Sequence, residues 1–149
     1  MTTSLSHILP LENIVLDMAV QDKQGLFQQL GRLFGHSDHV DADTVTAAIM
    51  EREAAGSTGL GCGVAVPHGR IPALTGASAA FVRLAEPIPF DSPDGKPVRL
   101  VIALLMSQNE DDLHLELLSE VASRFSDEGF RQQVLEEKDR EAVKRLFAG

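Results

Sequence analysis

The sequence has little cysteine and no long apolar run. Cys62 is the single cysteine among 149 residues, which excludes an internal disulfide. The longest apolar run, Leu100–Met106, has the length of a strand, whereas a membrane-spanning helix needs roughly 20 apolar residues. The first residues also lack the basic and apolar regions of a signal peptide. We therefore expect a cytoplasmic protein that is not itself inserted into a membrane.

Positive charge is also scarce. The 13 Lys and Arg residues are outnumbered by 22 Asp and Glu residues, and the formal net charge is -9. Because no local basic cluster offsets this charge, the phosphates of a nucleic acid would be repelled, and we expect no nucleic-acid partner. The content of 44% hydrophobic and 23% charged residues is that of an ordinary globular chain. At this length we expect one domain over residues 1–149.

Hydrophobic periodicity predicts a strand and two helices in the first third of the chain. A β-prone run at Ile14–Leu16 precedes apolar residues at helical spacing, and this helix is expected to stop at Gly35. Asp41 is a plausible N-cap for a second helix that ends near Gly56. Arg52 then lies in the last turn of this helix.

The middle of the chain is predicted to form strands. Residues 56–63 contain too much glycine for a helix and lead into a short strand, Val64–Val66, with His68 where this strand ends. Further strands are expected at Ala79–Leu84 and Val98–Met106, separated by a turn at Asp91–Gly95.

The last forty residues are predicted to form helices. Asn109–Asp112 offer candidate N-caps for a helix that carries His114 in its first turn. Two more stretches, around Phe130–Leu135 and Ala142–Phe147, each carry one apolar face. The fold class is therefore α/β (α+β), a single domain with a mixed parallel and antiparallel sheet flanked by helices.

The glycine run does not match a nucleotide-binding loop. A dinucleotide fingerprint needs a preceding strand and a following helix, but here a helix precedes and a strand follows. No Gly-Lys-Ser or Gly-Lys-Thr of a Walker loop occurs in the chain. Nucleotide binding is therefore not expected.

His68 is the strongest candidate for covalent chemistry. The imidazole has a reference pKa of about 6.5, so its neutral form is a competent nucleophile near physiological pH and can accept a phosphoryl group. Arg52 offers a planar fork of donors that suits phosphoryl oxygens, and His114 offers a further donor. Gly61, Gly63 and Gly69 permit close backbone approach and are candidates to bind phosphate oxygens through their N–H groups.

Two other interpretations use the same residues. Cys62, His68 and His114 are possible zinc ligands, but their spacing matches no common zinc motif, so we expect no metal. Cys62 is also a possible catalytic thiol activated by His68. Its glycine neighbours favour a small residue packed in a tight turn instead.

At these residues the chain resembles the fructose/mannitol-type enzyme IIA domain of the phosphoenolpyruvate-dependent phosphotransferase system, especially its nitrogen-regulatory branch. The resemblance lies in three blocks and extends over nearly the whole chain. They are Arg52-Glu53 with Gly56–Gly61, Val64–Gly69, and His114-Leu115 with Leu118-Ser119. One departure is Cys62, where relatives often have asparagine.

The resemblance implies a role for each candidate residue. His68 would accept phosphate from a small phosphocarrier, HPr or its nitrogen-branch relative NPr, and Arg52 and His114 would stabilise the transferred group. The chain would be a phosphotransferase component with a transient phosphohistidine and no cofactor. Because no IIB or IIC segment is apparent before Gly149, a regulatory role toward target proteins is favoured.

Two alternatives stay open. The chain is also compatible with the IIA component of a fructose or mannitol permease, which passes phosphate to a separate IIB protein. A non-catalytic binding module would keep the same fold without using His68.

Overall fold

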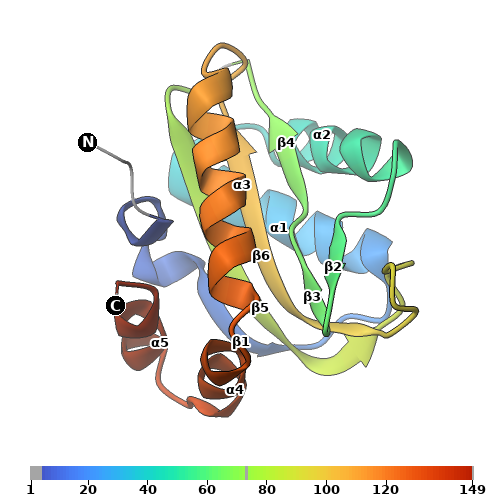
Figure 1. The fold of residues 1–149 in the computed structure, drawn as a ribbon. Coiled ribbons are helices and arrows are strands. Elements are labelled where there is room, and N and C mark those ends of the chain that lie inside the picture. The colour runs from blue at the N-terminus through green and yellow to red at the C-terminus, as the bar shows by residue number, and fades with distance from the viewer. Residues whose placement is uncertain (1–4, 73, 149) are drawn as a thin grey trace.

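The computed structural model describes residues 5–72 and 74–148 (Figure 1). The first four residues and Gly149 of the predicted domain 1–149 lie outside the described residues. The elements follow in this order: two short 3-10 helices, η1 (Leu5–Ile8) and η2 (Leu11–Asn13), then β1 (Ile14–Met18), α1 (Lys23–Asp38), α2 (Ala42–Ala54), β2 (Gly59–Gly61), β3 (Val64–Ala65), β4 (His68–Arg70), β5 (Ala77–Ile88), β6 (Val98–Met106), α3 (Asp111–Phe125), α4 (Glu128–Glu136) and α5 (Arg140–Ala148). Within the described ranges, no helix has the length and apolar character needed to cross a bilayer.

The sheet has six strands in the order β1-β5-β6-β3-β2, and β4 also pairs with β6. Strands β5 and β6 are antiparallel, whereas β1 runs parallel to β5. Strands β3 and β4 both run parallel to β6 along the same edge, with Val64 opposite Leu100 and His68 opposite Leu104. The predicted class, a single domain with a mixed sheet flanked by helices, is confirmed.

Helices cover both faces of the sheet, as Figure 1 shows. Successive side chains of a strand point to opposite faces. Leu100, Ile102 and Leu104 of β6 therefore pack into the cluster formed with α3, α4 and α5, while Val101, Ala103 and Leu105 pack into the cluster formed with α1 and α2. Burial on both faces explains why β6 reads as a continuous apolar run in the sequence.

The structure corrects the predicted end of the first helix. Helix α1 continues through Gly35 to Asp38 and ends before His39, which takes a left-handed φ of 56°. A Cβ at Gly35 would lie 3.2 Å from the Val40 carbonyl oxygen and 3.3 Å from the Ala42 Cβ. The absence of a side chain at Gly35 thus permits close packing against the start of α2, and Gly35 is not a helix stop.

Two other boundaries also differ from the prediction, whereas α3 begins within the predicted range Asn109–Asp112 but without a side-chain cap. The strand near residue 64 ends at Ala65, and His68 begins β4, because Pro67 has no N–H to donate and interrupts the pairing. Strand β5 extends to Ile88 through exposed residues that break the apolar pattern. Glu110 is the N-cap residue of α3, but its carboxylate accepts from the Ser107 hydroxyl at 2.8 Å and does not cap the helix.

A buried arginine connects β1, β5 and α4. Arg83 is 4% exposed, and its Nε and Nη2 donate to the two carboxylate oxygens of Asp17 at 3.1 and 3.2 Å. Its Nη1 donates to the carbonyls of Val134 and Leu135 at the end of α4, at 2.9 and 3.2 Å. The hydrogen bonds from Arg83 lower the pKa of Asp17 below its usual value. The guanidinium thus pairs with one carboxylate and satisfies the last carbonyls of a helix.

We predict that Arg83→Met lowers the free energy of unfolding by about 3 kcal/mol, because it leaves Asp17 and buried carbonyl groups without their donor. Urea denaturation followed by circular dichroism measures this change. Arg145→Met is the control, since Arg145 is exposed on α5. A loss for Arg83→Met no larger than that of the control would show that this arginine is not a structural connection.

Candidate functional site

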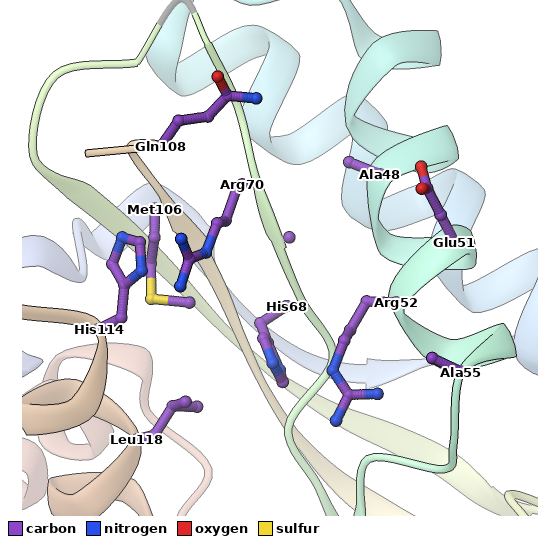
Figure 2. A pocket seen from close by; sticks show the side chains of 11 residues that line it. Ala48, Glu51, Arg52, Ala55, His68, Arg70, Met106, Gln108, His114 and Leu118 are labelled. Carbon is purple, nitrogen blue, oxygen red and sulfur yellow. The ribbon is translucent and has the colours of Figure 1, made fainter. Parts of the chain in front are cut away.

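A pocket of about 540 Å³ brings three predicted site residues together. It lies between α2, β4, the end of β6 and the start of α3, and it is lined by His68, Arg52 and His114. In Figure 2, Arg52 approaches His68 from α2, and His114 faces them from α3. Residues separated by up to 62 positions in the chain therefore share one cavity.

The position of Arg52 depends on close packing of α2 against β4. A Cβ at Gly69 would lie 3.1 Å from the Ala48 Cβ and 3.2 Å from the Ala48 carbonyl carbon. The absence of a side chain at Gly69 lets Ala48 lie on β4, and Arg52 follows one helical turn later beside His68. The Arg52 Nη1 donates to the Gly56 carbonyl oxygen at 2.9 Å, which orients the guanidinium.

One ring nitrogen of His68 is held by the backbone. Its Nδ1 lies 2.8 Å from the carbonyl oxygen of Val66. Because a carbonyl oxygen only accepts, this contact assigns the proton of the neutral ring to Nδ1. Nε2 then carries the lone pair, and the half-buried ring lines the pocket.

The surroundings of His68 favour its neutral form. Burial is the largest cause that lowers the pKa of His68 below 6.5, and the charges of Arg52 and Arg70 lower it further. The Val66 carbonyl and the Glu53 carboxylate oppose this shift without reversing it. A neutral imidazole is the nucleophilic form, so the lowered pKa of His68 favours the form that can attack.

Arg70 is a site residue that the sequence reasoning missed. It lines the same pocket, two residues after His68 on β4, and its Nη1 lies 2.8 Å from the Asp111 carboxylate. The sequence did carry a signal for Arg70. Residues i and i+2 of a strand point to the same face, so a side chain two positions after His68 is expected beside it. Asp111 also lies 3.9 Å from the His114 Nδ1, so one carboxylate is near both Arg70 and His114.

His114 is buried without a hydrogen-bond partner. Its side chain is 3% exposed, and neither ring nitrogen bonds to any group in the described part of the chain. Buried imidazole nitrogens are normally satisfied, so this unpartnered ring in the lining of a pocket is an exception that calls for an explanation. Its place in the first turn of α3 agrees with the prediction.

Of the other predicted site residues, only Gly69 lines the His68 pocket. Gly61 and Gly63 flank Cys62 in the turn between β2 and β3, outside the His68 pocket, whereas Gly69 lies inside it. Cys62 has a left-handed φ of 56° and is exposed, so the expectation that it is packed is wrong. It is held there by a 2.8 Å hydrogen bond from its N–H to Asp94. Among residues 5–72 and 74–148, no three His, Cys, Asp or Glu side chains cluster as metal ligands.

Comparisons with known proteins agree on one family. The model of the family described as "Phosphoenolpyruvate-dependent sugar phosphotransferase system, EIIA 2" matches residues 7–149. The crystal structure of nitrogen regulatory protein IIA-Ntr from Neisseria meningitidis is 42% identical, with a TM-score of 0.92 and coverage of 95% of this chain and 97% of that one.

Two further relatives have sugar-specific names. The fructose-specific EIIA component from Haloferax volcanii is 33% identical over 147 residues, covering 98% of this chain and 96% of that protein. Enzyme IIA-Mtl from Escherichia coli, solved in complex with phosphorylated enzyme IIB-Mtl, is 25% identical, with a TM-score of 0.78 and coverage of 93% and 95%.

The electrostatics of the pocket predict the titration of His68. Its ring should titrate with a midpoint below 6.5, and Arg70→Gln should raise that midpoint, because removal of a nearby positive charge favours protonation. Carbon-proton NMR of the imidazole across pH 4 to 8 measures both midpoints. Unchanged titration in Arg70→Gln would place this arginine too far from His68 to act on it.

Proposed function

Because this chain belongs to the EIIA 2 family of the phosphoenolpyruvate-dependent sugar phosphotransferase system and is a phosphoryl-transfer component, we propose that Nε2 of His68 accepts the phosphoryl group. The observation that supports this atom is the 2.8 Å contact between Nδ1 and the Val66 carbonyl. It fixes the ring and leaves Nε2 with the lone pair.

The proposed transfer is an in-line displacement at phosphorus. The lone pair of His68 Nε2 forms the new N–P bond while the N–P bond of the donor phosphohistidine breaks, and its electron pair returns to the donor ring. The Val66 carbonyl accepts the Nδ1 hydrogen bond throughout, so the imidazolium character that develops is stabilised without a proton transfer. Catalysis then consists of alignment and charge stabilisation.

Three side chains surround the incoming phosphoryl oxygens in this proposal. Arg52 and Arg70 supply positive charge from α2 and β4, and the unpartnered His114 supplies an N–H donor from α3. Charge-assisted hydrogen bonds of this kind are roughly twice as strong as neutral ones. Because the chain supplies these groups itself, the proposed reaction needs no metal or cofactor.

The donor in this proposal is a small phosphocarrier of the HPr or NPr type. The pocket is open to solvent at His68, which is half-exposed, so a second protein can bring its own phosphohistidine to Nε2. Transfer between two proteins requires this access.

We predict that His68→Ala abolishes phosphate uptake, because the removed ring is a reactant, whereas His114→Ala and Arg52→Lys slow uptake by roughly tenfold or more without moving the label. Incubation with radiolabelled phosphoenolpyruvate, enzyme I and an HPr-type protein, followed by mass mapping, measures rate and position. Circular dichroism confirms that each variant is folded. Stoichiometric label in folded His68→Ala, or label on His114, contradicts the assignment.

The ion pair between Arg70 and Asp111 competes with phosphorylation. Both side chains are largely exposed, at 49% and 76%, so the pair contributes little to folding stability. Phosphate on His68 presents a stronger anion to Arg70 than a single carboxylate does. We infer that Arg70 exchanges Asp111 for the phosphoryl group.

We predict that Asp111→Asn shifts the phosphoryl equilibrium with the donor toward this chain by about threefold, because the competing carboxylate is removed. Quench-flow or gel separation of the phosphorylated donor and acceptor measures this equilibrium. Asp112→Asn is the matched control, since the neighbouring Asp112 carboxylate is also exposed but does not pair with Arg70. Equal equilibria for the two variants would mean that the ion pair does not restrain Arg70.

For the role of the phosphorylated protein we propose regulation of a target protein. The 42% identity and TM-score of 0.92 to a nitrogen regulatory protein support this choice. Phosphorylation converts a neutral ring at an exposed pocket into an anionic group, which can create or remove contacts with a partner. The alternative role, transfer to a separate IIB protein, is favoured by the fructose-specific relative and by the solved complex of IIA-Mtl with IIB-Mtl.

We predict that at least one protein captured from extract of the source cells binds the phosphorylated and unphosphorylated forms with affinities that differ by tenfold or more. Calorimetry with each form, and with His68→Ala as a non-phosphorylatable control, measures the difference. Equal affinities for all captured proteins, together with rapid transfer to a sugar-specific IIB protein, would favour the permease role.

A further inference from the structure

A second pocket, of about 510 Å³, lies at the other end of β6 from His68. It is bounded by the turn between β2 and β3, the start of β6 and helix α4 (Figure 1). Met106 lines the His68 pocket and Leu100 lines this one. Six residues of extended strand separate the two pockets by roughly 20 Å. The second pocket is therefore not part of the phosphoryl-transfer site.

Positive charge is concentrated in this pocket. Lys96, Arg99 and Arg131 line it together with a single carboxylate, Glu128. This is unusual for a chain with a net charge of -9, in which acidic residues are the majority. Three cations in one cavity repel each other unless an anion is bound between them.

Much of the hydrogen-bonding capacity of these cations is free. The Lys96 ammonium has no hydrogen bond or ion pair with any residue in the described ranges. Arg131 uses Nη1 to hold the Phe125 carbonyl at 2.7 Å, and Arg99 uses Nε to hold the Leu84 carbonyl at 2.8 Å. These two bonds fix the guanidinium groups and leave other N–H donors of each fork for a ligand.

The neighbouring carboxylates already have partners. Asp17 lies 3.8 Å from Arg99 but accepts its hydrogen bonds from Arg83. Asp94 accepts from the backbone N–H groups of Cys62 and Lys96 at 2.8 and 3.1 Å. The Lys96 ammonium donates no hydrogen bond to either carboxylate, and its charge acts on Asp94 only as a minor cause that lowers the pKa of this carboxyl group.

The remaining walls are apolar. Pro87, Pro97, Leu100 and Leu135 line the pocket between the charged groups. Concave sites of 300 to 1,000 Å³ with mostly apolar walls and a few convergent polar groups are typical of small-molecule binding. The size and the mixed lining favour a compact ligand with one apolar part and one oxyanion over an extended acidic peptide.

We propose that this pocket binds a small organic anion, either a phosphate monoester or a carboxylate with an apolar body, independently of His68. Lys96 and Arg131 contact its oxyanion from opposite walls, and the prolines and leucines contact its apolar part. Glu128, which makes no hydrogen bond or ion pair through its carboxylate within the described ranges, weakens the binding because this carboxylate repels the oxyanion.

Phenyl phosphate is a suitable probe, and benzoate tests the carboxylate form of the same chemistry. Inorganic phosphate lacks the apolar body, and benzyl alcohol lacks the charge. Nitrogen-proton NMR of the full chain at fixed ionic strength should show saturable shifts for the amides of Gly63 and Gln132 with the first two compounds. Inorganic phosphate and benzyl alcohol should bind at least about threefold more weakly.

Charge variants with opposite expected effects separate binding from folding defects. Lys96→Gln should weaken phenyl phosphate binding by about threefold to tenfold, whereas Glu128→Gln should tighten it by about threefold. Lys138→Gln and Glu141→Gln are the matched controls, because both residues are exposed and neither lines the pocket. A gain of affinity in Glu128→Gln cannot arise from a partly unfolded protein.

Several outcomes overturn the proposal. Shifts confined to residues around His68, Arg52 and Arg70 would show that the anion binds only at the transfer site. Shifts that do not saturate would show that the pocket does not bind these anions specifically. Equal binding by Lys96→Gln and Lys138→Gln would show the same. Binding of an acidic peptide without binding of phenyl phosphate or benzoate would assign the surface to protein docking. Phosphate uptake by Lys96→Gln, measured in parallel, is expected to be unchanged. A failure of the proposal for the second pocket can therefore be told apart from a failure of the His68 assignment.

Discussion

The pairing of β6 on both edges positions His68 and its pocket. On one edge β6 binds β5, and on the other it binds β3 and then β4, with a break at Pro67. The Leu104 N–H donates to the Pro67 carbonyl at 3.0 Å, so the break is held in register. The break also sets the Val66 carbonyl 2.8 Å from the His68 Nδ1. Backbone pairing therefore orients the His68 ring.

Helices from opposite faces of the sheet complete the site. Helix α2 reaches β4 closely because Gly69 has no side chain, and α3 brings His114 from the other face. Arg52 and His114 share one pocket only when both helices are packed on the sheet. The two buried clusters that hold these helices in place thus have a direct functional consequence. Loss of packing on either face would move a charge away from Nε2.

Much of this arrangement could be predicted from the sequence, but some of it could not. The apolar run of β6 and the Asp41 cap of α2 were correct because each depends on local residues. The end of α1 was wrong because Gly35 serves packing against α2, a contact between elements that spacing does not show. Arg70 was missed for a related reason, since its ion pair with Asp111 joins positions 41 residues apart.

The exposure of Cys62 also depends on contacts between elements that local sequence does not show. Its glycine neighbours predicted a tight turn, which the structure has, but local sequence could not show whether this turn packs against anything. Likewise, Arg131 of α4 meets Lys96 and Arg99, which lie just before and within β6, only in the folded chain. A cluster of charges from separate parts of the chain cannot be predicted from the order of charges along the sequence.

In the proposed transfer, the Val66 carbonyl makes Nε2 the reactive atom of His68. Long-range nitrogen-proton NMR of the phosphorylated protein reads both ring nitrogens of this histidine directly. We expect the phosphoryl group on Nε2, with the proton retained on Nδ1 next to the carbonyl of Val66. A phosphoryl group on Nδ1 would contradict the account, because that nitrogen cannot both donate to Val66 and bond to phosphorus.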